Sequence, residues 1–333
     1  MINYLKLLEY FLYAFFFSLV ISPLIISIMK REKIKQTILE YVDVHQSKNG
    51  TPTMGGLIFL VAISLVSLIC FEGKSSCAKI VIWIFLAYGI VGFLDDFIKF
   101  KFKRNLGLRA YQKIIFQLLV SLVVGFYVYK NLGGVILIPF SNKLVDLGWL
   151  IIPFVVLIYL ATTNAVNLTD GLDGLASSTI LIFLISFLVL QLIFVQTGVV
   201  ASNVSSVEEM NNISTVAVVA CGGVLCFLLF NCFPAKIFMG DTGSLALGSL
   251  IASVSIFSGM ELYLPILGIV FVASAVSVII QVAYYKLTKK RIFLMAPLHH
   301  HFEKKGVHEV RITFCYALVS LLVGVVTILI NIL

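Results

Sequence analysis

Long apolar runs alternate with short polar stretches along almost the whole chain. A helix needs about twenty mainly apolar residues to cross roughly 30 Å of hydrocarbon. The shortest run, 243–259, begins directly after a charged motif. The ten segments in which we expect such helices are 8–29, 54–71, 78–98, 113–130, 147–166, 174–196, 213–233, 243–259, 263–285 and 312–332. The pattern therefore predicts an all-α, polytopic membrane protein with about ten transmembrane helices.

The composition indicates the same class of protein. Hydrophobic residues make up 60% of the 333 residues and charged residues 12%, and the mean hydropathy is +1.08. Because soluble domains carry about 25% charged residues, the composition excludes an ordinary soluble protein. The longest polar stretches, 30–53 and 286–311, are too short for a separate soluble domain. We therefore expect one integral membrane domain over residues 1–333.

The basic residues lie mainly in one set of loops. These loops hold 19 of the 24 Lys and Arg residues, and the opposite set, with both termini, holds five. Since basic loops are retained in the cytoplasm, we expect both termini on the extracytoplasmic side. The net charge of +8 then belongs mainly to the cytoplasmic face, which would attract anionic lipid headgroups and phosphorylated substrates. Topology determination alone also explains most of this bias.

The unusual polar motifs fall on the predicted cytoplasmic side, at the ends of apolar runs. An ionised carboxylate at the hydrocarbon boundary is costly and suggests a function. The motifs occupy 48–56, 95–99, 164–174, 231–241 and 299–301. Transporters place such groups near the middle of the bilayer. The position of the motifs therefore favours a catalytic cleft on the cytoplasmic side.

Five aspartates are the first candidates for this chemistry. They are Asp95, Asp96, Asp170, Asp173 and Asp241. Simpler interpretations are a surface ion pair between Asp95 and Lys99, four residues apart on one helix face, and a helix cap at Asp170 or Asp173. Two carboxylates about 4 Å apart repel by about 4 kcal/mol at an effective dielectric constant of 20. Convergence would therefore require a bound cation, and oxygen ligands beside substrate phosphates suit Mg2+.

Two further motifs could serve a phosphorylated substrate. Asp241 stands in a glycine-rich loop that could bring backbone N–H groups and one carboxylate to a phosphate-bound metal. Phe238 could stack on a base, although an aromatic residue beside a membrane is equally an interfacial anchor. The triplet His299–His301 is a poor single-metal site because adjacent side chains diverge. It could donate hydrogen bonds to a diphosphate or shuttle protons, or be a His-rich polar loop.

Together these motifs resemble the phospho-N-acetylmuramoyl-pentapeptide-transferase family, within the polyprenyl-phosphate N-acetylhexosamine-1-phosphate transferase superfamily. They stand in the family's order and span nearly the whole chain. The motifs are Thr51-Pro-Thr-Met-Gly-Gly56, Asp95-Asp96-x-x-Lys99, Asn164-Ala-Val-Asn-Leu-Thr-Asp-Gly-Leu-Asp-Gly-Leu175, Phe238-Met-Gly-Asp241 with Ser244-Leu-Ala-Leu-Gly248, and Met295-Ala-Pro-Leu-His-His-His-Phe-Glu303. The first and last favour this branch over relatives that transfer GlcNAc-1-phosphate.

The resemblance implies an enzyme that moves phospho-MurNAc-pentapeptide from UDP-MurNAc-pentapeptide to undecaprenyl phosphate, giving lipid I and UMP and requiring Mg2+. The lipid phosphate would be the nucleophile and would attack the phosphorus attached to the sugar. The resemblance also implies a multi-pass protein of the bacterial cytoplasmic (inner) membrane. Its surroundings would be the lipid bilayer, with a lateral groove for the prenyl chain, a homodimeric assembly as in the family, and no nucleic-acid partner.

The resemblance implies roles for individual residues. Asp241, with Asp96, would hold the metal, and Asp95 would deprotonate or orient the lipid phosphate. Substrate-binding positions would be Lys48, Asn167, Asp170, Gly171, Leu172, Asp173, Asn231 and Phe238. The catalytic polar cleft around the phosphates would be completed by Lys99, Lys113, His299, His300 and His301.

One loop departs from the family pattern. Many members carry an Arg and an Asp-Gly-Pro stretch before the His and Lys that precede Thr-Pro-Thr-Met-Gly-Gly, and Tyr41-Val-Asp-Val-His45-Gln-Ser-Lys48 lacks that Arg and the Gly-Pro. The departure weakens inferences about contacts to the sugar or peptide and does not affect the metal and diphosphate residues.

Two alternative functions are a sugar-1-phosphate transferase that uses UDP-GlcNAc, and a secondary transporter whose carboxylates bind coupling ions.

Overall fold

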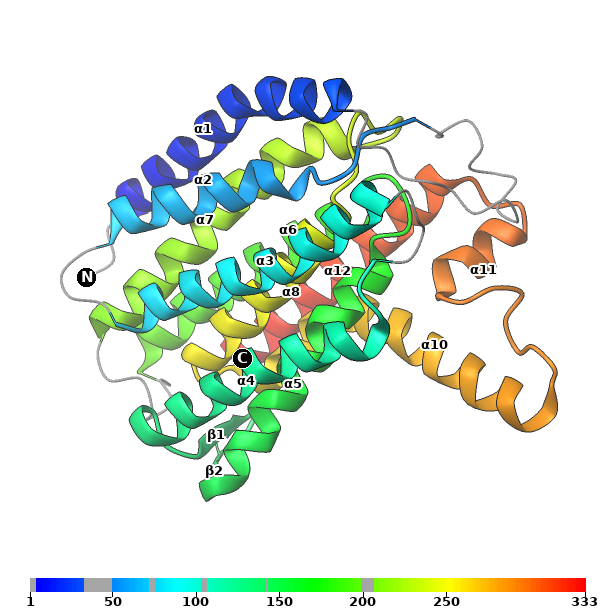
Figure 1. Ribbon diagram of the computed structural model, residues 1–333. Helices are drawn as coiled ribbons and strands as arrows, with labels where there is room; N and C mark the ends of the chain where they lie inside the picture. The colour runs from blue at the N-terminus through cyan, green and yellow to red at the C-terminus, as the bar shows by residue number, and fades with distance from the viewer. Residues whose placement is uncertain (1–3, 33–49, 72–75, 103–106, 142, 199–206) are drawn as a thin grey trace.

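The protein folds as an assembly of long helices that run roughly alongside one another (Figure 1). The computed structural model describes residues 4–32, 50–71, 76–102, 107–141, 143–198 and 207–333. Within these residues, nine helices are long and apolar enough to cross a membrane, and a tenth apolar helix is shorter. The predicted all-α, polytopic membrane fold is confirmed.

Each of the ten predicted segments is helical. The shortest of these ten helices is α2, which has 15 residues because it begins only at the second glycine of the Thr-Pro-Thr-Met-Gly-Gly motif. The corresponding helices are α1 (Tyr4–Arg31), α2 (Gly56–Cys70), α3 (Cys77–Phe102), α4 (Ala110–Asn131), α5 (Ile151–Thr169), α6 (Leu175–Thr197), α7 (Val207–Asn231), α8 (Gly240–Phe257), α10 (Ile269–Thr288) and α12 (Glu309–Ile332).

The structure adds elements that the hydrophobic pattern did not predict. Strands β1 (Val135–Ile138) and β2 (Lys143–Asp146) form an antiparallel hairpin between α4 and α5. We expected one helix over 263–285. The structure instead has the 3-10 turn η3 (Glu261–Tyr263) and then the short helix α9 (Leu264–Leu267). A break at Gly268 separates α9 from α10. A further 3-10 turn, η2 (Gly148–Leu150), precedes α5. The His triplet lies on a short helix, α11 (Leu298–Lys304).

Helix α8 forms the centre of the assembly. Every residue from Thr242 to Phe257 is buried, and the helix is rich in Gly, Ala and Ser. Small residues let helix backbones approach closely inside a membrane, where packing holds helices together. A Cβ atom added at Gly248 would lie 2.7 Å from the Cα of Thr163 on α5, and one added at Gly56 would lie 2.3 Å from the Cα of Gly243. Glycine is therefore required at both helix contacts.

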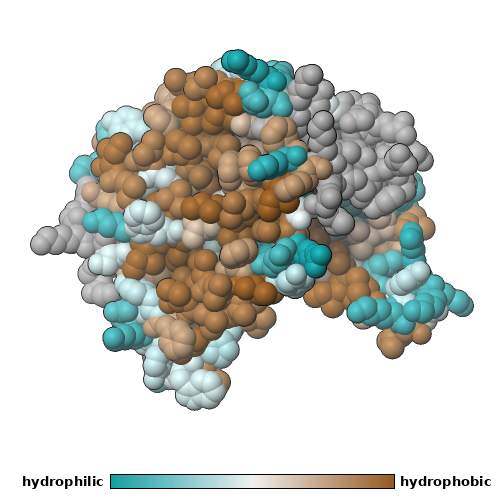
Figure 2. All heavy atoms as spheres, in the orientation of Figure 1, coloured by the Kyte–Doolittle hydropathy of each residue, from teal (hydrophilic) through white to brown (hydrophobic). Residues whose placement is uncertain are grey.

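Apolar side chains cover much of the outer surface. Figure 2 shows a broad hydrophobic area on one face, with hydrophilic residues gathered toward its margins. Exposed residues include Val20 on α1, Val123 on α4 and Leu322 on α12. Only a lipid environment stabilises so much exposed apolar surface. The outer surface therefore agrees with helices that span a bilayer.

One buried carboxyl group lies far from the polar motifs. Glu261, in η3, is 6% exposed and lines a small cavity with apolar residues such as Val128, Leu132 and Val155. Its Oε2 atom has no hydrogen-bond partner among the described residues. Burial raises the pKa of Glu261 to about 8, because the apolar surroundings disfavour the charged form.

We expect Glu261 to make the stability depend on pH. The folded protein keeps this proton up to about pH 8, whereas the unfolded chain loses it near its ordinary pKa of about 4.3. The folded state binds more protons in this window, so stability falls as the pH rises through it, by at most about 1.4 kcal/mol per pH unit. Thermal unfolding in detergent between pH 5.5 and 8.5 should show this fall in the wild type and a flatter profile in Glu261→Gln. Exposed Glu208 provides the control, Glu208→Gln, which should keep the wild-type slope; an unchanged slope in Glu261→Gln would contradict the prediction.

Candidate active site

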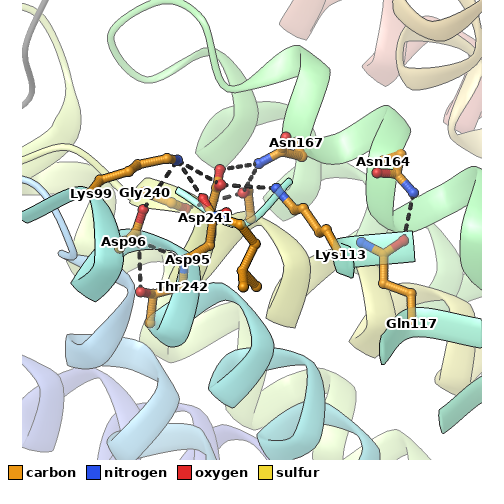
Figure 3. Close-up of polar contacts among 12 residues, drawn as sticks. Asp95, Asp96, Lys99, Lys113, Gln117, Asn164, Asn167, Gly240, Asp241 and Thr242 are labelled. Carbon is orange, nitrogen blue, oxygen red and sulfur yellow. Dashed lines mark hydrogen bonds and ion pairs between the residues drawn. The ribbon is translucent and has the colours of Figure 1, made fainter. Parts of the chain in front are cut away.

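The ends of four helices meet at one polar cluster, drawn in Figure 3. Asp95 and Asp96 lie near the end of α3, and Lys113 lies in the first turn of α4. Asn167 lies in the last turn of α5, and Asp241 lies in the first turn of α8. Segments that are up to about 150 residues apart in the sequence therefore place their polar residues at the same end of the assembly.

Asp241 is the centre of the cluster. Its Oδ2 atom lies 2.8 Å from Nζ of Lys99 and 2.8 Å from Nζ of Lys113. Its Oδ1 atom accepts a hydrogen bond of 2.6 Å from Nδ2 of Asn167, which also donates to Oγ of Ser244 at 2.8 Å. The positive end of the α8 dipole further favours a negative charge at this position. Both carboxylate oxygens thus have fixed partners.

Asp95 and Asp96 are held by backbone groups as well as by a lysine. Asp95 accepts a 2.8 Å hydrogen bond from the N–H of Leu108 and lies 2.5 Å from Nζ of Lys99. Asp96 accepts hydrogen bonds from the N–H and the hydroxyl of Thr242, at 2.9 and 2.7 Å. Each carboxylate is only about 4% exposed. Their orientation is therefore set by packing and not by solvent.

Two glycines allow these helix ends to approach. A Cβ atom added at Gly92 would lie 2.1 Å from the backbone oxygen of Asp241. Gly240 has a φ of +74°, a left-handed conformation that L side chains rarely adopt. A Cβ atom there would also lie 2.6 Å from Oδ2 of Asp96. Larger residues at either position would push α8 away from α3.

The cluster has the charge and the ligand atoms expected of a site for a hard cation. Carboxylate oxygens of Asp95, Asp96 and Asp241 lie within 4.8 Å of one another. Among the described residues, the ion pairs to these three carboxylates come from two ammonium groups, those of Lys99 and Lys113. The grouped ligands are all oxygens, which suits Mg2+ better than a thiophilic metal. The residues therefore fit the Mg2+ ion that the sequence predicts.

The pKa of a carboxyl group beside the cluster is raised. Asp170 follows α5 and is half-buried. Burial, followed by the charges of Asp241, Asp96 and Asp173, raises the pKa of Asp170 to about 8. The shift shows that negative charge is already concentrated at this end of the assembly.

The Thr-Pro-Thr-Met-Gly-Gly motif reaches the cluster through backbone hydrogen bonds. The N–H of Phe238 donates to the carbonyl of Pro52 at 2.8 Å, and the N–H of Gly55 donates to the carbonyl of Phe238 at 2.8 Å. The N–H of Gly56 donates to the carbonyl of Met239 at 2.9 Å. The motif thus fixes the loop that leads into Asp241, and the Phe238 side chain is left half-buried.

Several predicted substrate-binding residues use their polar atoms inside the protein. The amide of Asn231, 2% exposed, accepts from Ser177 Oγ at 2.5 Å and donates to the carbonyl of Ile237 at 3.1 Å. Oδ2 of Asp173 accepts from the N–H of Ala235 at 2.9 Å. Leu172 is buried. These three side chains brace the site loops in this structure, and their predicted contact with a nucleotide stays a prediction.

The three histidines diverge, as expected for neighbours on one short helix. His299 is fully buried, and its Nε2 would be 2.3 Å from a Cβ atom added at the exposed Gly171. His300 Nδ1 lies 2.9 Å from Oε2 of Glu303. His301 Nδ1 instead accepts a 3.1 Å hydrogen bond from the N–H of Leu294. His301 therefore holds the preceding loop, and the predicted place of the three histidines around the phosphates stays a prediction.

One predicted site residue lies outside the described residues, and two supporting residues were not predicted. Lys48 and the departing loop 41–48 lie outside the residues that the structure describes. Thr242 and Ser244, which support Asp96 and Asn167, were not predicted as site residues. No periodicity or charge marks Thr242, whose one signal was that it directly follows Asp241. Ser244 stood out only as the first residue of the Ser244-Leu-Ala-Leu-Gly248 motif.

Comparison with known proteins gives consistent matches. The model of the family described as glycosyl transferase family 4 matches residues 77–259, and signature 1 of the phospho-N-acetylmuramoyl-pentapeptide-transferases matches residues 48–60. Similar proteins of that name come from Clostridium beijerinckii, 44% identical over 324 residues (96% of this chain and 95% of the relative), and Clostridioides difficile, 41% identical over 321 residues (96% and 95%). A third, from Caldanaerobacter subterraneus, is 43% identical over 314 residues (93% and 94%).

Thr242 offers a test of the Asp96 contact. Thr242→Val keeps the shape of the side chain and removes one hydrogen bond to a buried carboxylate, which costs about 1–3 kcal/mol. Thermal unfolding in detergent should show a lower midpoint for Thr242→Val than for Thr242→Ser, which keeps the hydroxyl. Equal midpoints for the two variants would show that the hydroxyl contributes nothing to Asp96.

Proposed function

Since the chain belongs to glycosyl transferase family 4 and to the phospho-N-acetylmuramoyl-pentapeptide-transferases, we propose that it transfers phospho-MurNAc-pentapeptide from UDP-MurNAc-pentapeptide to undecaprenyl phosphate. The products are lipid I, a precursor of peptidoglycan, and UMP. The observation that carries the proposal is the convergence of three carboxylates and two lysines at Asp241. Such a site suits a reaction between two phosphorylated substrates.

The reaction exchanges one phosphoanhydride bond for another. An oxygen of the lipid phosphate attacks the phosphorus attached to the sugar, and the bond from that phosphorus to the oxygen of the departing UMP breaks. Phosphate monoesters lose their second proton near pH 6, so the lipid phosphate is mostly dianionic at neutral pH. The nucleophile therefore needs orientation and charge neutralisation more than it needs a strong base.

Asp241, together with Asp95 and Asp96, would hold the Mg2+ ion. The bound ion supplies charge neutralisation at the diphosphate and stabilises the leaving phosphate. Asp96 is oriented for this task by its two hydrogen bonds from Thr242. The fixed orientation limits rearrangement when the ion arrives, which is the benefit of supporting contacts around a metal ligand.

Lys99 and Lys113 act on the anionic substrates. Both ammonium groups contact the same oxygen of Asp241, and Lys99 also contacts Asp95. Lys113 is 15% and Lys99 is 34% exposed, so each can turn toward a phosphate without leaving the cluster. Of the two roles considered for Asp95, orientation is the better supported, because its oxygens already hold Lys99 and the N–H of Leu108.

The nucleotide binds beside this cluster. Gly171 is exposed and Phe238 is half-buried, so both can contact a ligand directly. Asn231, Asp173 and the buried Leu172 keep the surrounding loops in place. A nucleotide contact by Lys48 is proposed from the family motif alone. His299 lies next to Gly171 in the 170–174 turn, and the ring of His300 lies beside that of His299. Their ring nitrogens place polar groups near the diphosphate.

The site faces the cytoplasm, where UDP-linked donors are available. This orientation rests on the basic loops and places both termini outside the bacterial cytoplasmic membrane. The prenyl chain of undecaprenyl phosphate lies in the bilayer and enters a groove from the side. The chain acts as one membrane domain over residues 1–333, and two copies form a homodimer.

The first test is UMP release by the purified protein in detergent with undecaprenyl phosphate and Mg2+. We expect release with UDP-MurNAc-pentapeptide and not with UDP-GlcNAc. Asp241→Asn should lower turnover more than about a hundredfold, since even residues that merely support metal ligands contribute 10–100-fold. Glu208→Gln, at an exposed position in the first turn of α7, serves as the control for folding. Release with UDP-GlcNAc alone would assign the protein to GlcNAc-1-phosphate transfer, and no release from either donor by folded protein would revive the transporter interpretation.

A second test concerns the lysines as competitors of the metal. An ammonium group on Oδ2 of Asp241 opposes a divalent cation at the same oxygen. We expect Mn2+ to bind Lys113→Gln about fivefold more tightly than wild type in the absence of substrate, corresponding to about 1 kcal/mol of lost competition, while UMP release falls. Electron paramagnetic resonance of Mn2+ measures the affinity. Lys130→Gln, at the opposite end of α4, is the matched control; equal affinity in the two variants would contradict competition at Asp241.

A further inference from the structure

A pair of amide side chains, buried Gln117 and half-buried Asn164, joins α4 to α5 beside the catalytic cluster. Nδ2 of Asn164 donates a 2.8 Å hydrogen bond to Oε1 of Gln117, as Figure 3 shows. Gln117 has no exposed surface. The hydroxyl of Tyr88, on α3, donates to the backbone carbonyl of Gln117 at 3.1 Å. The amide pair therefore lies where three helices meet.

The amide pair is one helical turn away from two residues that contact Asp241. Gln117 follows Lys113 by four positions on α4, and Asn164 precedes Asn167 by three positions on α5. Residues three or four apart lie on the same face of a helix. Lys113 and Asn167 contact different oxygens of Asp241, Oδ2 and Oδ1. A rotation of either helix would thus move one contact relative to the other.

A second contact between the same helices lies further from the cluster. A Cβ atom added at Gly125 on α4 would lie 3.0 Å from the carbonyl oxygen of Ile152 on α5. Close backbone packing fixes the distance between the helices there, yet it places no directional constraint on their rotation. The amide hydrogen bond, which is directional, supplies that constraint two turns nearer to the site.

The amide of Gln117 is not needed to satisfy its neighbours. Its Nε2 atom has no partner among the described residues, and an unsatisfied buried donor lowers stability. Nδ2 of Asn164 also donates to the carbonyl of Leu160 at 2.8 Å, so it would keep a partner if Gln117 were apolar. An apolar residue of the same shape at 117 would therefore fold at least as well. A polar residue there is better explained by function than by stability.

We propose that the hydrogen bond between Gln117 and Asn164 sets the rotation of α4 against α5 and so directs Lys113 and Asn167 to the two oxygens of Asp241. Both amides are positioning residues, since neither contacts the reacting atoms. The inference rests on the proposed function, in which Lys113 and Asp241 act on the phosphates and the metal. A small displacement of such groups can lower turnover a hundredfold.

The experiment compares Gln117→Met, Asn164→Leu and the double variant with wild type. We expect Gln117→Met to lower kcat for UMP release about tenfold to a hundredfold, with KM for the UDP-linked donor changed less than twofold and no loss of thermal stability. The double variant should be no slower than the slower single variant, because both changes break the same contact. The reciprocal exchange Q117N/N164Q, which can re-form an amide pair, should recover part of the lost kcat.

Gln191 on α6 provides a matched control. It is also fully buried, and its Nε2 atom donates to the carbonyl of Met210 and to Ser258 Oγ, at 3.3 and 3.1 Å, far along the sequence from the cluster. Gln191→Met should lower thermal stability and leave kcat unchanged in the folded protein. If Gln117→Met behaves in the same way, Gln117 is a structural residue and the proposal is overturned.

Binding of Mn2+ without substrates separates this proposal from the proposed function. If Gln117 directs Lys113 to Asp241, Gln117→Met should bind Mn2+ two- to fivefold more tightly than wild type and should add nothing in a Lys113→Gln background. An unchanged Mn2+ affinity in Gln117→Met would overturn the positioning role even if the wild type is active. Absence of UMP release by the wild type would overturn the proposed function, while the Mn2+ comparison would still measure the coupling between α4 and Asp241.

Discussion

The approach of α8 to α3 is the constraint on which the rest of the site depends. Gly92 lets the backbone of Asp241 lie against α3, and Gly240 turns the chain into α8 with a left-handed conformation. These contacts bring Asp241 beside Asp95 and Asp96, which the sequence separates by about 145 positions. Because α8 is buried along its length, it can shift only if the helices around it shift too. The carboxylates are therefore held together by packing, against their mutual repulsion.

This repulsion explains the arrangement of the other charges. Lys99 and Lys113 offset two of the three negative charges, and the raised pKa of Asp170 removes a further charge nearby. In the proposed reaction, a divalent cation would offset the remaining negative charge, and anionic substrates would draw the lysines away from Asp241. Affinity for the metal and affinity for the diphosphate would then be linked through the same two ammonium groups. The proposed positioning role of Gln117 and Asn164 belongs to this system, because the amide pair would direct Lys113.

Much of the site could be predicted from the sequence, and the parts that could not have a common cause. The paired aspartates, Asn167 and Asp241 stand out because charged or amide side chains at the ends of apolar runs are costly there. Thr242 and Gln117 carry no such signal, since a hydroxyl or amide within a helix is equally often a packing residue. Asn231 shows a different limit of local patterns: its motif suggested a ligand contact, and only the tertiary structure shows that both ends of its amide also bind within the protein.

The sequence alone determined the class of the protein, the number of apolar helices and the end of each helix that carries polar residues. It could do so because crossing a hydrocarbon layer is a constraint on consecutive residues. The tertiary structure decided which oxygen of Asp241 meets Lys113 and which meets Asn167, that Thr242 holds Asp96, and that His301 turns away from its neighbours. These contacts depend on how far each helix is rotated and displaced against the next. Close packing between residues distant in the chain sets that rotation, and no local pattern records it.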